Sequence, residues 1–224
     1  MSKTFKIMCV NAGSSSLKFK LYERDEGAKN ETTLSGKATH LKALTNGIVE
    51  RIGHEDGIFT LKKPGGFKHT EVLPVHNHDE AAKLVLEGLK KFGVIEDIKE
   101  IAGVGNRVVQ GGKYFSDSAL FDDYAYSKIK ELIPLDPLHA QAHLTCFDAF
   151  KKALPEAGEV AVFDTSFHQT MEAKEYRYPL PYEYYEKYAV RRYGAHGTSH
   201  KYLSIRAKET YFPKQEHVNI ITCH

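Results

Sequence analysis

The segment from Asn11 to Lys18 has the residue types of a phosphate-binding turn. Gly13 permits a tight turn, and the turn N–H groups and the hydroxyls of Ser14 and Ser16 can converge on phosphate oxygens. Lys18 adds a positive charge. The segment is not a Walker loop, because the GxxxxGK[ST] pattern is absent and a strand rather than a helix is expected after it. A plain polar hairpin turn is the alternative interpretation.

Arg107 stands in an otherwise apolar run, directly before two valines and a Gln-Gly-Gly sequence. Its planar guanidinium can hold a carboxylate or a phosphate through two parallel hydrogen bonds. An internal ion pair with an Asp or Glu would satisfy the same charge, and the sequence leaves both interpretations open.

Two further segments carry single polar groups that could act in a site. Asp164 follows the apolar run 160–163, and open α/β sheets place ligand sites at the carboxyl ends of such strands. A carboxylate there can hold Mg²⁺ through water or act as an acid or base, whereas a helix or turn cap is the simpler role. His139 follows a proline-containing turn, and a lone histidine is more often a structural hydrogen-bonding group than a catalyst.

His196 and His200 have the i, i+4 spacing of a metal pair, but no glutamate lies between them. The glycines on both sides of His196 argue against a helix there, and Ser199 is expected to cap a helix that follows. His196 would then lie in the preceding loop. A donor toward an anionic transition state fits this position better than zinc ligation.

The elements that must position these residues alternate between strands and helices, which predicts an α/β fold. The apolar patterns predict strands at 7–10, 17–21, 48–52, 58–62, 101–109, 160–163 and 218–223. They predict helices from Asn77 to about 92, and at 140–153, 182–188 and 199–208. Because a domain rarely stops at a buried strand, the last strand leads us to expect that the chain is part of a longer protein.

Composition excludes several classes of protein. The 224 residues carry a net charge of +2, which is too small to predict binding to nucleic acid or to a membrane surface. No secretory signal or apolar run of about 20 residues is present. The three cysteines have no CxxC spacing, which favours a reducing cytoplasm. We expect Cys9 and Cys223, which stand in apolar runs, to be buried.

Taken in order, the motifs closely resemble the acetate kinase family over essentially the whole chain. They are NAGSSSLKF at 11–19, RVVQGG at 107–112, DPLH at 136–139, VFDTSFHQTM at 162–171, YGAHGTSHKY at 193–202 and ITCH at 221–224. The resemblance implies the two-domain fold of the sugar kinase, heat-shock ATPase and actin superfamily (ribonuclease H-like). It would consist of a domain at 1–157 and the start of a truncated nucleotide-binding domain at 158–224. It also implies a cytoplasmic homodimer that interconverts ATP and acetate with ADP and acetyl phosphate, using Mg²⁺.

The resemblance also implies a role for each matching residue. The roles are magnesium binding for Asn11, nucleotide-phosphate contact for Lys18, carboxylate binding for Arg107, acid/base duty for Asp164, stabilisation of the transferring phosphoryl group for His196, a further active-site position for His139, the start of a phosphate-binding segment for His224, and walls of the acyl pocket for Val109 and Leu138. Ser14 and Ser16 belong with Lys18 as phosphate contacts. A carboxylate substrate is ionised at neutral pH and needs no strong base, so we expect Asp164 chiefly to orient Mg²⁺ or water.

The chain departs from the family pattern at several positions. Asn106 and Gln110 stand where the family usually has histidines, and LDPLHAQ replaces LAPLHNP. Ala195 replaces a frequent phenylalanine, which predicts a roomier pocket and better use of propionate. The alternatives are a non-catalytic phosphate- or nucleotide-binding fragment, a propionate-preferring kinase, a sugar kinase of the same superfamily and, least favoured, a metallohydrolase. We also expect the 224 residues alone to have little kinase activity.

Overall fold

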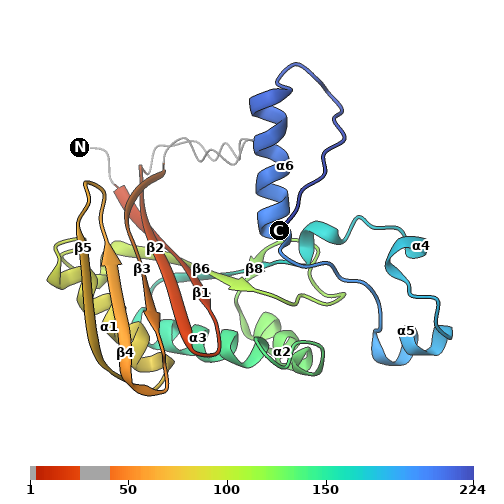
Figure 1. The fold of residues 1–224 in the computed structure, drawn as a ribbon. Helices are drawn as coiled ribbons and strands as arrows, with labels where there is room; N and C mark the ends of the chain where they lie inside the picture. The colour runs from red at the N-terminus through yellow and green to blue at the C-terminus, as the bar shows by residue number, and fades with distance from the viewer. Residues whose placement is uncertain (1–3, 26–40) are drawn as a thin grey trace.

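The computed structural model describes residues 4–25 and 41–224, and its strands form one eight-stranded sheet in the order β5-β4-β3-β2-β1-β6-β8-β7 (Figure 1). The strands are β1 (Thr4–Ala12), β2 (Ser16–Asp25), β3 (Leu41–Glu50), β4 (His54–Lys62), β5 (Lys68–Val75), β6 (Ile101–Val108), β7 (Ala119–Leu120) and β8 (Gly158–Phe163). The α-helices are α1 (His78–Lys91), α2 (Asp123–Glu131), α3 (Ala140–Ala153), α4 (Ala173–Tyr176), α5 (Tyr182–Tyr188) and α6 (Gly197–Tyr211). The predicted α/β class is confirmed.

The sheet has an antiparallel half and a parallel centre. Strands β1 to β5 follow one another as an antiparallel meander, whereas β6 runs parallel to β1, and β8 runs parallel to β6. Val10 is the partner of Asn106, and Val108 is the partner of Phe163. This register brings the carboxyl ends of β1, β6 and β8 to one edge of the sheet, where a ligand site is expected.

Helices α1 and α3 pack against each other and cover one face of the sheet, below the strands in Figure 1. The predicted apolar face of α1 is buried. Asn77 caps this helix, because its side chain accepts a hydrogen bond from the Glu80 N–H at 2.9 Å. Gly93, at φ +63°, follows its end as predicted. Helix α3 has the predicted bounds.

Four of these strands and α-helices were not predicted from the sequence, namely β5, β7, α2 and the four-residue α4. Strand β5 lies at the sheet edge, where Pro74 costs no ladder hydrogen bond and alternate side chains face solvent. Strand β7 has only two residues. Helix α2 is short, and its N-cap is Asp122, whose side chain accepts a hydrogen bond from the Ala125 N–H. It buries Ala125 and Ile129 in a second core with Phe163.

Three predictions about the C-terminal part and the cysteines are wrong. Residues 218–223 form no strand, because no neighbouring strand of the described part pairs with them, and Ile221 is 94% exposed. Ser199 lies inside α6, whose N-cap is His196. Cys9 and Cys223 are exposed, since Cys9 lies on the sheet face opposite α1 and α3 and Cys223 lies in the irregular end.

The proposed division at 157/158 falls directly before β8, which pairs with β6 in the same sheet. The division stays a prediction. Beyond β8 the chain leaves the sheet, and α6 stands apart from it on the side opposite α1 and α3, while α4 and α5 extend to one side (Figure 1). In the described residues, no helix has both the length and the apolar character that a bilayer span requires.

Candidate functional site

Arg107, near the end of β6, is the centre of a charged cluster formed by three adjacent strands. Its Nη2 and Nε donate to Asp164 Oδ2 at 2.6 and 3.1 Å, and its Nη1 donates to Asn11 Oδ1 at 3.1 Å. The Asp164 side chain is 2% exposed, whereas that of Arg107 is 30% exposed. The internal ion pair left open by the sequence therefore exists, and part of the guanidinium still faces solvent.

Asp164 is held on both oxygens. Its Oδ1 accepts from the Thr198 hydroxyl at 3.1 Å, and its backbone N–H donates to Val108 O at 2.9 Å. Thr198 lies in the first turn of α6, so this bond joins the N-terminal end of α6 to the end of β8. A buried carboxylate with three hydrogen bonds from Arg107 and Thr198 is well placed to orient the guanidinium.

A cavity of about 310 Å³ opens beside Arg107. Its lining residues are Cys9, Val10, Asn11, Lys18, Phe19, Gly105, Arg107, Val162 and Thr198. Lys18 reaches the cavity because it is the β2 partner of Asn11 in the β1/β2 hairpin. Arg107 and Lys18 therefore both line this mainly apolar space, which is large enough for a small carboxylate.

The turn that joins β1 to β2 is a hairpin turn, and the strand expected after it is present. Gly13 N donates to Ser16 O at 2.7 Å, and His78 Nε2 donates to Gly13 O at 2.9 Å from the start of α1. Ser14 is exposed and Ser16 is half-buried. Phosphate contact by these two serines stays a prediction.

His139 is the N-cap of α3 and pairs with Asp136, with 2.8 Å between Nδ1 and Oδ1. Its ring stacks on that of His143, one helical turn later, at 6.2 Å. Burial, helped by the nearby Arg107 charge, lowers the pKa of His143 to about 4, although Asp136 acts in the opposite direction. The neutral ring accepts the Val109 N–H at 3.2 Å, which fixes the backbone after Arg107.

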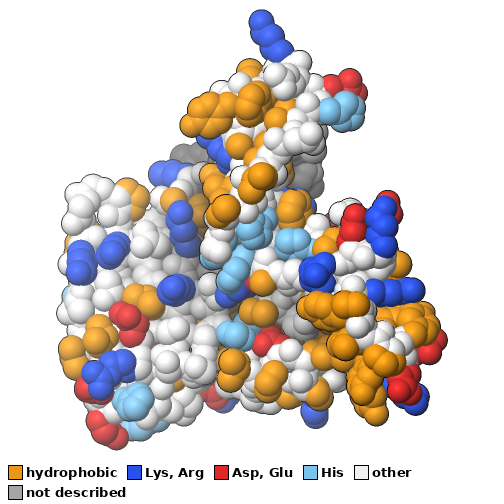
Figure 2. Space-filling view, turned by 45° about the vertical axis from the view of Figure 1, so that its right-hand side comes forward, with side chains coloured by type: hydrophobic (Ala, Val, Ile, Leu, Met, Phe, Trp, Pro, Cys, Tyr) orange, Lys and Arg blue, Asp and Glu red, His pale blue; other side chains and the backbone are white. Residues whose placement is uncertain are grey.

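His196 lies directly before α6 in a left-handed conformation, with φ +51°. Its ring stacks on that of His224 at 4.1 Å, and His224 Nδ1 lies 3.0 Å from Ser199 Oγ. The first N–H groups of α6 have no partners within the helix, so two imidazoles and a helix N-terminus meet at one point. Histidine side chains gather between α6 and the sheet in Figure 2.

Some predicted site residues remain apart from the cavity. Val109 is half-buried and Leu138 is 76% exposed, and neither lines the space beside Arg107. Their role as walls of an acyl pocket stays a prediction. His200 Nδ1 meets the Thr222 hydroxyl at 2.7 Å. Within residues 4–25 and 41–224, no three His, Cys, Asp or Glu side chains are grouped so that they could hold a metal.

Three residues of the site region were missed by sequence reasoning. His143 could have been found from its i, i+4 spacing to His139. Thr198 and His168 gave no signal, because their contacts depend on how the chain returns to the end of β8.

Comparison with known proteins identifies the family of the chain. Residues 6–224 match the model of the acetokinase family. The acetate kinases of Bacillus velezensis and Bacillus subtilis are 48% and 47% identical over 219 residues, or 98% of this chain. The chain spans about half the length of these curated relatives, 52% in each case.

Solved structures of the same kind superimpose on the chain. A crystal structure of Porphyromonas gingivalis acetate kinase matches 92% of this chain and 48% of its own length, with a TM-score of 0.81 and 40% identity. A propionate kinase from Francisella tularensis matches 92% of this chain and 48% of its own length, with a TM-score of 0.78 and 35% identity. On the family match over 219 of its 224 residues, this chain belongs to the acetokinase family.

Proposed function

We propose that this chain carries the carboxylate- and phosphate-binding part of an acetate kinase, which transfers a phosphoryl group between ATP and acetate. The observation that carries the proposal is the partly exposed Arg107, held by Asp164 and Asn11 at the mouth of a cavity that also contains Lys18. A mainly apolar cavity of this size, bordered by Arg107 and Lys18, suits a small carboxylate and the phosphate that it receives.

Arg107 would bind the acetate carboxylate. Two of its N–H groups donate to Asp164 and one donates to Asn11, so the orientation of the guanidinium is fixed before substrate binds. A guanidinium has five N–H donors, which leaves two for a substrate oxygen. Fixing the donor in advance lowers the ordering cost of binding.

Asp164 would act as a positioning group rather than as a base. Acetate is already ionised at neutral pH, and both Asp164 oxygens accept hydrogen bonds from protein donors. An Asp164→Asn variant removes the charge that orients Arg107, so we expect a higher KM for acetate and a lower rate. A near-normal rate with unchanged Mg²⁺ dependence would contradict this role.

His196, His224 and the N-terminal end of α6 would face the phosphoryl group. Phosphoryl transfer needs positioning and neutralisation of charge on the equatorial oxygens, and imidazole and backbone N–H groups supply both. His139, held by Asp136, would add a further donor near the same site. Lys18, with Ser14 and Ser16, would contact nucleotide phosphates.

The residues present fit a magnesium ion that is shared with nucleotide phosphates. Asn11 Oδ1 and Asp164 are oxygen groups, the kind of ligand that Mg²⁺ prefers, and this ion commonly takes one or two protein groups beside water and phosphate. Both groups are engaged by Arg107, so they would serve the ion through its water or by releasing that bond. Bound Mg²⁺ would neutralise phosphate charge. The homodimer and the cytoplasmic location implied by the resemblance also stay predictions.

Propionate is the second candidate acceptor. A propionate kinase is among the structures that the chain resembles, and Ala195, the residue before His196, is small. Each additional buried CH₂ contributes about 0.8 kcal/mol. If Ala195 borders the acyl pocket, propionate is used nearly as well as acetate, and Ala195→Phe restores a preference for acetate.

The test is hydroxylamine trapping of acyl phosphate with acetate, propionate and a sugar as acceptors, beside Bacillus subtilis acetate kinase. Because the chain spans about half of that relative, we expect acyl phosphate from carboxylates at a rate far below the relative's rate. Transfer to the sugar would contradict the assignment. Binding of ATP and phosphate without any transfer would favour the non-catalytic alternative.

A further inference from the structure

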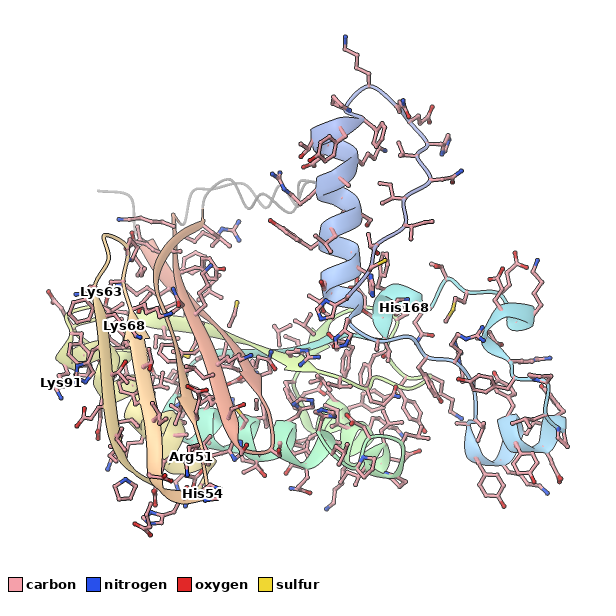
Figure 3. All side chains as sticks on the ribbon, viewed as in Figure 1. Arg51, His54, Lys63, Lys68, Lys91 and His168 are labelled. Atoms are coloured by element: carbon pink, nitrogen blue, oxygen red, sulfur yellow. The ribbon has the colours of Figure 1, made fainter. Side chains whose placement is uncertain are left out.

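His168 lies at the base of α6 (Figure 3), outside the cluster formed by Arg107 and Asp164. It ends the short 3₁₀ helix Ser166–His168, which begins two residues after Asp164. This short helix packs against α6. His168 is therefore only four residues from Asp164 in the chain, and it belongs to a short helix that packs against α6.

The contact is made with the turn that precedes α6. His168 Nε2 lies 3.0 Å from Ala195 O, and a carbonyl oxygen can only accept, so Nε2 carries the proton. The ring also lies directly on Gly194, where an added Cβ would approach His168 Cδ2 to 2.2 Å. The imidazole therefore fits against the backbone of both residues before His196.

The turn that His168 contacts is strained. Gly194 has φ +80° and His196 has φ +51°, a left-handed conformation that non-glycine residues adopt only when their surroundings enforce it. On the other side of His196, a Cβ on Gly197 would come within 1.9 Å of Asp164 O. The Thr198 hydroxyl also binds the Asp164 carboxylate. His196 is thus flanked by two anchors, of which Asp164 is one.

We propose that His168 is the second anchor, a positioning residue that holds His196 in its left-handed conformation. That conformation aims the His196 ring at His224, on which it stacks at 4.1 Å. The importance of this aim for phosphoryl transfer rests on the function proposed above, but the anchoring itself does not.

Two substitutions separate the hydrogen bond from simple packing. In His168→Gln the side-chain amide N–H can take the place of Nε2–H, whereas His168→Leu keeps bulk without a donor. The control is His76→Gln, because His76 is exposed and its ring bonds, among the described residues, to Glu55 and Glu80 rather than to α6. All are made in the 224-residue chain and compared with the wild type without ligand.

The readouts are the His196 ring signals in ¹⁵N-histidine NMR, assigned with His196→Gln, and hydrogen exchange of the His200 amide, which donates to His196 O at 3.0 Å. We expect His168→Leu to shift the His196 signals and to speed exchange about five-fold, the effect of one hydrogen bond of ordinary strength. His168→Gln should restore the wild-type His196 signals and the wild-type exchange rate. The Tm of this variant should be close to that of His168→Leu. Signals and exchange that do not differ between the wild type and His168→Leu would overturn the proposal.

Acyl phosphate formation by the same variants distinguishes this proposal from the proposed function. If His168→Leu disturbs His196 and lowers kcat with KM unchanged, both proposals are supported. If it disturbs His196 while turnover is unaffected, the anchor is present and the catalytic role of His196 is wrong. If the chain has no turnover, the NMR and exchange readouts decide on the anchor.

Discussion

Glu159 in β8 is expected to make the chain less stable as the pH rises, and Glu159→Gln should remove that effect. The side chain is buried beneath α3, where it accepts the Asn106 amide N–H at 2.5 Å. Its other oxygen has no partner among the described protein atoms. Burial raises the pKa of Glu159 from 4.5 to about 7, although Asn106 and Lys151 act in the opposite direction.

The sign and size follow from proton linkage. In the unfolded chain Glu159 ionises near pH 4.5, whereas in the folded chain it keeps its proton to about pH 7. The folded state therefore binds more protons between these values, and stability is lost as the pH rises through this interval. At 1.36 kcal/mol per pH unit, the whole interval corresponds to about 3 kcal/mol of unfolding free energy.

The assay is urea unfolding of the wild type and Glu159→Gln at pH 5, 6, 7 and 8. The glutamine cannot ionise and matches the glutamate in shape, so the two proteins should be close in stability at pH 5. At pH 8 the variant should be more stable by about 3 kcal/mol. Glu156→Gln, which changes an exposed glutamate nearby, is the control and should follow the wild type. A difference between wild type and Glu159→Gln that does not change with pH would refute the reasoning.

Three other predictions concern single side chains. Gly197→Ala should lower Tm, because a Cβ 1.9 Å from Asp164 O forces a backbone shift that costs about 1–3 kcal/mol; an unchanged Tm would contradict the fit of this turn. Asn77→Ala should cost about 1 kcal/mol in urea unfolding through loss of the α1 cap, and no loss would contradict it. Burial raises the pKa of Cys146 to about 12, so iodoacetamide at pH 8 should modify the exposed Cys223 and spare Cys146 until the chain unfolds; equal rates would contradict this.

Local signals in the sequence were sufficient for the elements that depend on local interactions. Helices α1 and α3 were predicted because their apolar residues repeat on one face and because a cap or a proline-containing turn precedes each. The first hairpin was predicted because its second strand alternates apolar and polar residues. These features are fixed by neighbours within a few positions in the chain.

Features that depend on distant partners could not be derived in this way. Residues 218–223 have an apolar strand pattern, but a strand forms only beside another strand, and here the segment returns along α6. Ser199 is a good capping residue, yet α6 begins at Gly197 with His196 as its N-cap, because the glycines on both sides of His196 pack closely against His168 and Asp164.

The candidate site also has features that the sequence predicts and features that depend on distant partners. Arg107, Asp164 and Asn11 were identified from residue type and motif, and the sheet register brings them together. The two Asp164 oxygens accept hydrogen bonds from Arg107 and Thr198. This could not be predicted, because it depends on how α6 returns to the end of β8.

Binding of acetate to the wild type and to Arg107→Gln, measured by saturation-transfer NMR, tests the central claim most directly. Arg51→Gln, which removes an arginine paired with Asp56 on the β3–β4 turn, is the matched control. The account predicts saturable binding to the wild type and to Arg51→Gln, and at least about ten-fold weaker binding to Arg107→Gln, the expected loss of a charged hydrogen-bond donor. Equal acetate binding by all three proteins would contradict the assignment of Arg107 as the carboxylate-binding residue.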